Sequence, residues 1–404
     1  MVESPFSMDI QIFLNKYGNI QTAQKKLQKK FSIDITPQEL VFSNGNTETV
    51  WLYNYNKQKA TGASKIENEA KGLILNSKHE VVSRSFVRFF DINTRYAAAI
   101  DWKTTHLEQK LDGSMVIAYG YKGELFFQTR SSATASNIVP GTKDLTFREA
   151  VINILKHKNV DNPFLPFTKR KNHLPRYSWV FEYIGPENKF ITPYEESDLV
   201  CLAIISKELN AEVPTKFVDA WAKEFKMSRP DFFHGFENKN DTIIFAKSSS
   251  LPFEEGYVAI DNNNNRVKIK NPTYIQIAKA VDADSNVLPI AKLVLVGLAE
   301  EVAQHFDRLA DILLLLDSVF WELLDEVDNI IHYNKNINSN KDFAAVFKKH
   351  KLSSILFKLW KGKIDSLENM CQSISPELLI TETKKRYERN YYEAIKKCFD
   401  KQHL

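Results

Sequence analysis

The chain has 404 residues, of which 43% are hydrophobic and 26% are charged, a composition typical of a globular protein with two or three domains. The net charge is only +4, so a binding site for a polyanion must be a local cluster of cations rather than a property of the whole surface. Three widely spaced cysteines include no CxxC pair, which argues against a disulfide framework or a structural zinc site. No signal peptide or membrane-spanning run is visible, so we expect a cytoplasmic protein in a reducing compartment, with no membrane partner.

The first half of the chain is predicted to be rich in strands. Residues 1–50 contain one short helical stretch, 22–31, in turn-rich sequence. Short β-branched and aromatic runs then alternate with turns as far as residue 274. We predict strands or hairpins in 48–56, 70–76, 85–92, 115–130, 177–185 and 256–270, and helices in 147–158 and 215–226. The run Asp261–Asn265 predicts a hairpin turn, because Asn and Asp tolerate positive φ.

The last third of the chain is predicted to be helical. Apolar residues recur every three or four positions in 291–334, 340–350, 363–374 and 375–401, the last opening with Ser375 as N-cap. The sequence therefore predicts an α+β body followed by an all-α domain. We place the domains at 1–280, with 1–50 as an N-terminal extension of the first, and 281–404.

The string "KLDGS" places Lys110 and Gly113 at a turn in front of a buried strand. A lysine can act as a nucleophile at neutral pH if burial or nearby cations lower its pKa. Glycine lets the backbone approach a ligand closely. Taken alone, however, K-x-D-G also occurs as a simple hairpin turn.

Charged residues in three other predicted strands strengthen the functional interpretation of this turn. Lys268 and Lys270 alternate in "VKIK", so both project from one strand face, which is either a phosphate site or a solvated face. Glu182 lies within an apolar and aromatic strand, where a carboxylate must be paired, in a salt bridge or on a metal. Glu255 begins the hairpin partner of the lysine strand. Arg88 stands beside Phe89 and Phe90, facing either a nucleotide or the edge of the core.

The order of these residues is that of the covalent nucleotidyltransferases, and in detail the chain resembles the phage-type ATP-dependent RNA ligase 1 family. The motifs that carry the resemblance are "KLDGS", "FEYIGPEN", "EGYVAI" and "VKIKNPTY", preceded by "EAKGLIL" and "SRSFVRFF". They cover about residues 50–275. The resemblance implies a nucleotidyltransferase (ATP-grasp-like ligase) domain of antiparallel sheets with flanking helices. It also implies ATP and Mg²⁺ or Mn²⁺ as cofactors.

The resemblance also implies roles for individual residues. Lys110 would be the nucleophile that carries AMP, Lys268 and Lys270 would hold the α-phosphate, and Glu255 would bind the metal directly or through water. The residues with implied nucleotide contacts are Lys71, Arg88, Phe90, Asp112, Gly113, Arg130, Glu182, Leu202, Val258 and Tyr274. Leu202 and Val258 would pack their apolar side chains against the adenine ring, although both residues could also be ordinary members of the hydrophobic core.

Three positions depart from the family pattern, which has arginine in place of Lys71 and lysine in place of Arg88 and Arg130. Each exchange keeps the charge, but a lysine point charge does not replace a guanidinium fork. We therefore expect altered binding of the β- and γ-phosphates.

The function implied is ATP-dependent joining of RNA 5′-phosphate and 3′-hydroxyl ends, as in the repair of nicked tRNA, alongside a separate end-healing kinase-phosphatase. The helical domain carries Lys/Arg clusters that suit either RNA phosphates or a solvated surface. Two alternatives stay open: another covalent nucleotidyltransferase, such as a DNA ligase or capping-type enzyme, and a non-catalytic RNA-binding relic of the fold.

Overall fold

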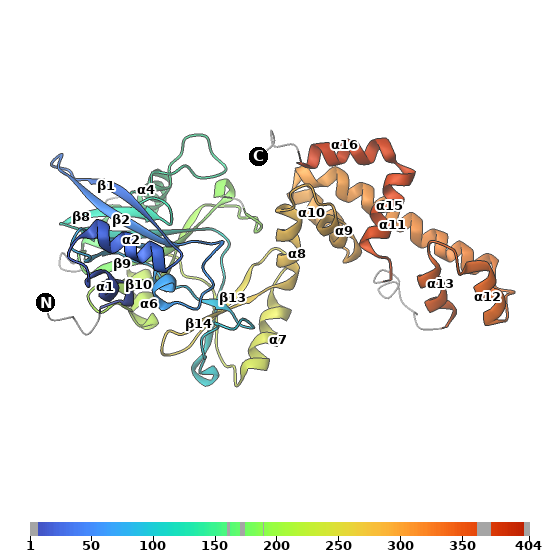
Figure 1. Ribbon diagram of the computed structural model, residues 1–404, viewed down its shortest axis with the longest axis horizontal. Helices are drawn as coiled ribbons and strands as arrows, with labels where there is room; N and C mark the ends of the chain where they lie inside the picture. Colours follow the sequence, from blue (N-terminus) through green and yellow to red (C-terminus); the bar gives the residue numbers. More distant parts are fainter. Residues whose placement is uncertain (1–6, 160–161, 170–173, 189, 362–372, 400–404) are drawn as a thin grey trace. The chain divides into compact units, whose positions relative to one another are not determined.

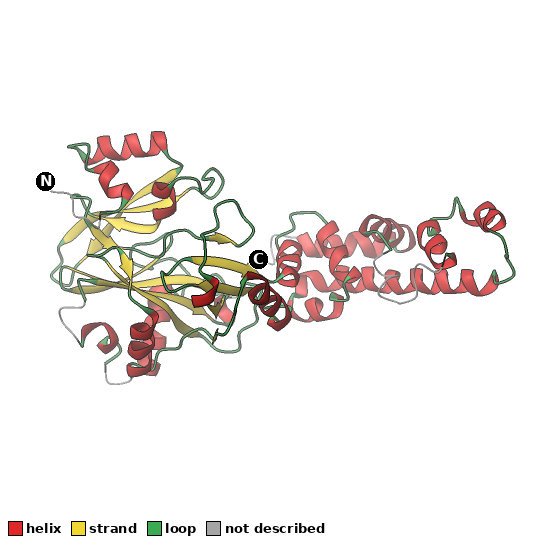
Figure 2. Ribbon diagram, turned by 90° about the horizontal axis from the view of Figure 1, so that it is seen from below, coloured by secondary structure: helices red, strands yellow, loops and turns green. Residues whose placement is uncertain are grey.

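The structure is a computed structural model that describes residues 7–159, 162–169, 174–188, 190–361 and 373–399. The chain divides into two compact units, Met1–Asn271 and Pro272–Leu404. The first unit is a mixed α+β body and the described part of the second is helical (Figures 1 and 2). The predicted α+β fold class is confirmed.

Three antiparallel-rich sheets form the first unit. The first sheet has the order β1-β2-β3-β4: β1 (Ile33–Val41), β2 (Thr47–Tyr55), β3 (Lys71–Leu75) and β4 (Val81–Ser83). The second has the order β11-β10-β9-β7-β8: β7 (Ser114–Tyr121), β8 (Glu124–Thr129), β9 (Tyr177–Ile184), β10 (Asp198–Ser206) and β11 (Ala211–Glu212). The third has the order β12-β6-β13-β14-β5: β5 (Phe90–Asp91), β6 (His106–Gln109), β12 (Phe232–Phe233), β13 (Gly256–Ile260) and β14 (Arg266–Lys270).

Helices and short helical turns connect and cover these sheets. In chain order they are α1 (Asp9–Leu14), α2 (Ile20–Lys30), α3 (Lys65–Glu69), η1 (Trp102–Thr104), α4 (Phe147–Lys158), α5 (Leu165–Thr168), η2 (Pro186–Asn188), α6 (Thr215–Glu224) and α7 (Lys239–Ser249).

The second sheet is buried on one face by α4 and α6. Alternate residues of β9, including Trp179, Phe181 and Tyr183, pack with apolar side chains from these two helices. The intervening β9 positions face the other way, where Val180 packs with Phe86 and Ile117. Because side chains alternate along a strand, Glu182 shares this second face. The alternation thus directs the Glu182 carboxylate away from the aromatic core.

The third sheet has its core on the side of α7. Leu107, Tyr257 and Val267 pack there with residues that include Phe245 of α7. Side chains of β6, β13 and β14 at the alternating positions point to the opposite face of the sheet. Among them are Glu108 and Lys268, which lie in line across the strands because both flank Val258.

The described part of the second unit consists of helices. They are α8 (Pro272–Val281), α9 (Leu288–Leu295), α10 (Ala299–His305), α11 (Asp307–Tyr333), α12 (Asn340–Phe347), α13 (Ser353–Trp360), α15 (Pro376–Arg386) and α16 (Glu388–Phe399). The long helix α11 buries residues at a spacing of three and four, from Leu309 to Val327, against α9, α10, α15 and α16. Within the described ranges, no helix combines the length and apolar character that crossing a membrane requires.

Several expected elements agree with the structure and others differ from it. Both predicted hairpins form, as β7–β8 and β13–β14, and the side chain of Ser375 caps α15 by accepting a hydrogen bond from the Leu378 amide (3.1 Å). The helical run 291–334 is broken into three helices, and 375–401 is broken at Tyr387 into α15 and α16. The helix expected in 363–374 lies almost wholly outside the described residues.

One strand predicted from the sequence was too long, and several strands were missed, among them β1, β6 and β10. In 85–92 only Phe90–Asp91 is a strand, because the preceding residues connect the sheets and use their apolar side chains, such as Phe86, in the core between them. Strand β1 was missed because it is an edge strand with only Ile33 and Leu40 buried, and its Pro37 is tolerated there.

Gly120, near the end of β7, is predicted to be important for the stability of the first unit. An added Cβ would overlap the Leu174 carbonyl oxygen, a backbone atom that cannot move alone. Gly120→Ala should lower the free energy of unfolding by about 1–3 kcal/mol, measured by urea denaturation. Gly18→Ala is the control, since its Cβ would meet no atom within 4 Å, and equal effects of the two changes would contradict the packing argument.

Candidate active site

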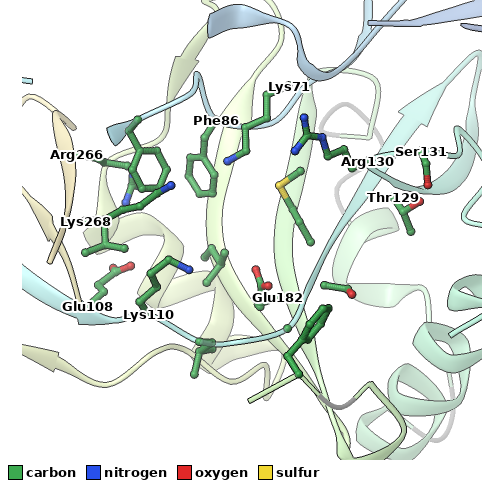
Figure 3. A pocket seen from close by; sticks show the side chains of 18 of the residues that line it. Lys71, Phe86, Glu108, Lys110, Thr129, Arg130, Ser131, Glu182, Arg266 and Lys268 are labelled. Carbon is green, nitrogen blue, oxygen red and sulfur yellow. The ribbon is translucent and has the colours of Figure 1, made fainter. Parts of the chain in front are cut away.

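The main cavity of the first unit has a volume of about 530 Å³ and is lined by residues from all three sheets. Eight of the residues singled out from the sequence line it: Lys71, Lys110, Gly113, Arg130, Glu182, Leu202, Val258 and Lys268. Figure 3 shows the ends of Lys71, Lys110 and Lys268 directed into this cavity, with the Glu182 carboxylate to the right of Lys110 and below Arg130 in this view. Its size is within the range of 300–1,000 Å³ that holds small-molecule ligands.

The end of β6 fixes the position of Lys110. Its backbone amide donates to the carbonyl of Gly256 (2.8 Å), so the residue stays attached to β13 just after β6 ends. Gly256 adopts a φ of 120°, a left-handed value that favours glycine, and a Cβ there would overlap the Ile269 carbonyl oxygen. A backbone that only glycine fits thus aligns Lys110 with the β13–β14 hairpin.

The Glu255 carboxylate is shared by two lysines. One oxygen forms an ion pair with the Lys110 ammonium, and the other lies 3.3 Å from the Lys270 ammonium. The Glu255 side chain is only 9% exposed, so this ion pairing takes place largely out of water. The ion pair holds the Lys110 ammonium at the cavity wall.

Lys268 and Lys71 contribute two further ammonium groups, each close to aromatic rings. The Lys268 ammonium lies 5.2 Å from the centre of the Phe89 ring, and Lys71 lies 5.1 Å from Phe89 and 5.6 Å from Phe86. Burial, assisted by the charge of Lys268, lowers the pKa of Lys71 to about 7. Burial and the charge of Lys110 also lower the pKa of Lys268. An anionic ligand would stabilise the charged form of both lysines.

Glu182 places a carboxylate on the opposite side of the cavity. Burial raises its pKa to about 7, although the positive charges of Lys110 and Lys71 act in the other direction. Gly113 makes room for this side chain, since a Cβ at Gly113 would lie 3.0 Å from the Glu182 Cγ and overlap the Tyr183 carbonyl oxygen. The glycine of "KLDGS" is thus explained by close packing of the turn against β9.

Arg130 and Arg88 both stack on Tyr55. Their guanidinium carbons lie 4.4 and 4.3 Å from the centre of the Tyr55 ring, and Arg130 also donates to the Tyr55 carbonyl (3.3 Å). Arg88 donates to the Ala60 carbonyl (3.2 Å) and is not among the residues that line the cavity. Of the two arginines, only Arg130 is positioned for a ligand in the cavity.

Leu202 and Val258 occupy special positions among the cavity residues. Leu202 is the extra residue of a bulge in β10, between Cys201 and Ala203 in the pairing with β9. A bulge re-aims a side chain that would otherwise follow the alternation of the strand. Val258 stands directly between Glu108 and Lys268 in the third sheet.

Besides Arg88, Lys270 and Glu255, three other candidates do not line the cavity. The Asp112 carboxylate accepts hydrogen bonds from the backbone amides of Ile191 (2.8 Å) and Thr192 (3.1 Å), which makes it an anchor for the segment after β9. Phe90 packs against the Tyr96 ring (5.9 Å) and beneath Arg88. Tyr274 is a buried residue of α8, in the second unit.

The sequence reasoning missed several residues of the cavity wall, above all Glu108, Arg266, Phe86 and Tyr55. Arg266 continues the alternation of Lys268 and Lys270 one step towards the turn, and its guanidinium lies 4.7 Å from the Phe86 ring centre. Glu108 is two residues before Lys110 and pairs with Arg229 (2.8 Å). Period-two spacing around the recognised residues was the signal that could have revealed both.

A preformed metal site is not found among the described residues, where no three His, Cys, Asp or Glu side chains cluster suitably. Glu255 and Glu182 are the carboxylates near the lysines, and Mg²⁺ is commonly held by one or two carboxylates together with substrate phosphates and water. The residues present therefore suit a divalent cation that arrives with a phosphorylated ligand.

Comparison with known proteins identifies the class of this chain. Residues 69–274, half of the chain, match the family model described as RNA ligase. The chain therefore belongs to the phage-type RNA ligase family. The match contains every segment that supplies a lysine or carboxylate described above.

One curated relative and two solved structures are similar to the chain. A protein of Autographa californica nuclear polyhedrosis virus named "Putative bifunctional polynucleotide kinase/RNA ligase" is 27% identical over 309 residues, which cover 72% of this chain and 41% of that protein. This chain thus spans less than half the length of that relative. An archaeal ATP-dependent RNA ligase has a TM-score of 0.45 at 14% identity and covers 70% of this chain and 69% of its own. A mutant of the Naegleria gruberi RNA ligase with AMP and Mn has a TM-score of 0.35 at 14% identity, covering 44% of this chain and 52% of its own.

The raised pKa of Glu182 predicts a pH-dependent stability difference. Below about pH 4.5 the carboxyl is protonated in the folded and unfolded states, whereas above its folded pKa of about 7 the folded state must bury a charge. Glu182→Gln removes this penalty, so the ligand-free variant should be more stable than the wild type by about 3 kcal/mol at pH 8, with no difference at pH 4. Urea denaturation across this pH range is the measurement. A variant that is less stable at pH 8 would show that attraction to Lys110 and Lys71 outweighs burial.

Proposed function

We propose that the protein is an ATP-dependent RNA ligase that works through a lysyl-AMP intermediate on Lys110. The observation that supports this most directly is the Lys110 ammonium at the wall of a nucleotide-sized cavity, paired with Glu255 and facing Lys268, Lys71 and Glu182. Membership of the RNA ligase family supports the same activity. ATP and RNA ends are the proposed substrates.

In the first step, the Lys110 amine attacks the α-phosphorus of ATP, forms a P–N bond and expels pyrophosphate. Lys268 and Lys270 then stabilise negative charge on the α-phosphate as the bond forms. A divalent cation, Mg²⁺ or Mn²⁺, held by Glu255 and the phosphates would neutralise phosphate charge.

The remaining cavity residues are assigned to binding ATP. Glu182 and the Gly113 turn would contact the ribose, and Leu202 and Val258 would enclose adenine between apolar surfaces. Arg130 and Lys71 would attract the β- and γ-phosphates. Arg88 would contribute indirectly, by holding Tyr55 against Arg130.

In the second and third steps, AMP passes from Lys110 to the 5′-phosphate of an RNA, and a 3′-hydroxyl then attacks that phosphate and releases AMP. The proposed role is RNA repair, with nicked tRNA as a candidate substrate. The ends would be prepared by a separate kinase-phosphatase, a proposal supported by the name of the viral relative, which combines a kinase with a ligase. The adenylylation chemistry is assigned to the first domain and RNA specificity to the helical one.

Part of the basic charge in the helical unit is tied up in ion pairs. Lys351 bonds to Glu326 (2.9 Å) and Glu382 (2.7 Å), and Arg386 bonds to Glu322 (2.8 Å) and Glu326 (2.7 Å). These two cations therefore stabilise the packing of the helices. The exposed Lys384 and Lys385 are better candidates for contacts with RNA phosphates.

Lys110→Ala is predicted to abolish covalent labelling of the protein by α-labelled ATP and Mg²⁺, because it removes the amine proposed to attack the α-phosphorus. Denaturing electrophoresis measures the label. Lys103→Ala is the matched control, an exposed lysine seven residues upstream that should label like the wild type. If the Lys110→Ala variant retained the label, the proposed mechanism would be refuted. If the labelled wild type sealed nicked DNA but not RNA, the assignment of RNA as the substrate would be refuted.

A second prediction concerns RNA binding by the helical unit. Replacing Lys384 and Lys385 together by glutamine should weaken binding of a broken tRNA anticodon loop. The slope of log K against log [salt] should become less steep by roughly 1, because fewer phosphates are neutralised. Nitrocellulose filter binding at several salt concentrations gives the slope. The control is Lys335→Gln with Lys341→Gln, exposed lysines outside the clusters. If both pairs behave alike, the clusters are an ordinary solvated surface.

A further inference from the structure

A second hollow of about 340 Å³ lies on the same face of the third sheet as the main cavity. Glu108 lines both hollows. The pairing register places Phe232 of β12 directly opposite Glu108 of β6, which is itself opposite Val258 of β13. Side chains that are opposite each other in an antiparallel pair lie on the same face. Phe232 therefore stands in the cross-strand row that contains Glu108, Val258 and Lys268.

The two residues of β12 have different surroundings. Phe233 points to the core side, where its ring packs against Phe245 (5.1 Å) and Tyr257 (5.7 Å). Phe232 points to the hollow and is 55% exposed, with its ring near the His234 ring (5.1 Å). A large aromatic side chain exposed on an edge strand is costly unless something covers it. The position of Phe232 beside a hollow suggests a ligand with a flat apolar face.

The rest of the hollow offers polar groups suited to the edges of a nucleobase. Asn262 and Asn264 bring amide donors and acceptors from the β13–β14 turn, and the exposed Lys216 of α6 adds a cation. The wall shared with the main cavity is rigid, because Arg229 joins Glu108 (2.8 Å) to Asp219 (2.8 Å) and donates to the Leu202 carbonyl (2.9 Å). Aromatic rings with nearby amides and a cation are the usual elements of single-stranded nucleic-acid binding.

We propose that this hollow binds one unpaired nucleoside of the RNA substrate, with its base stacked on Phe232 and its phosphate near Lys216. The inference rests on the proposed function for the identity of the ligand. Phe232 is one strand and two residues away from Lys110, about 8 Å between Cα positions from standard strand geometry. The nucleoside is therefore close to the end being joined, and it occupies a site distinct from that of the ATP base.

The test is the binding of a short, 5′-phosphorylated single-stranded RNA to the full chain, followed by fluorescence anisotropy. Phe232→Ala should raise the dissociation constant by roughly 5- to 100-fold, the range for loss of one base–aromatic stack. Phe232→Trp should restore binding to near the wild-type value. Phe217→Ala is the matched control, since Phe217 lies on α6, is 57% exposed and does not line this hollow.

Abasic substitution of the RNA, one position at a time, identifies the stacked nucleoside. An abasic substitution at one position should weaken binding of the RNA to the wild type. The same substitution should have little further effect on binding to Phe232→Ala. Equal dissociation constants for Phe232→Ala and Phe217→Ala would overturn the proposal, as would an effect of Phe232→Ala on the KM for ATP as large as that on RNA. Labelling of Lys110 by ATP is scored separately, so failure of the ligase mechanism is distinguished from failure of the nucleoside site.

Discussion

The arrangement of the site depends on repulsion between cations that the fold forces together. Lys71, Lys110 and Lys268 line one cavity together with Glu182, and Lys270 shares the carboxylate of Glu255 with Lys110. Burial, together with the charges of neighbouring lysines, lowers the pKa of Lys71 and of Lys268 and so disfavours their protonated forms. A polyanionic ligand in the cavity would relieve this unfavourable charge, which the ligand-free protein retains at a cost in its own stability.

The packing of the sheets stabilises the fold on one face of each sheet and leaves the other face for the charged site. Aromatic residues of β9 and the helices α4 and α6 bury one face of the second sheet, and α7 covers one face of the third. The remaining faces of the same strands are then available for Glu182 on one sheet and for Glu108 and Lys268 on the other. Alternation along the strands thus separates the stabilising core from the charged cavity with no need for long loops.

The sequence predicted those parts of the site that depend on local spacing. Lys268 and Lys270 alternate on one strand, and the hairpin turn after Ile260 brings Glu255 beside Lys270, so their proximity followed from local rules. The stacking of Arg88 and Arg130 on Tyr55 did not follow, because these residues come from separate strands and a connecting segment, whose packing is set by tertiary contacts. For the same reason the anchoring role of Asp112, bonded to amides almost 80 residues later, was not visible.

The exchanges of lysine and arginine relative to the family pattern are explained together by the aromatic residues beside them. Two guanidinium groups can approach one tyrosine ring because each is planar and weakly hydrated, whereas two ammonium groups in the same place would retain tightly held water. The compact Lys71 instead fits between Phe86 and Phe89, next to Lys268, where a guanidinium would need more space. The exchanges therefore form one coupled change in side-chain packing around the phosphate end of the cavity. Reverting a single position would keep a cation beside the same aromatic ring but change its shape, so the effects of neighbouring reversions should not be additive.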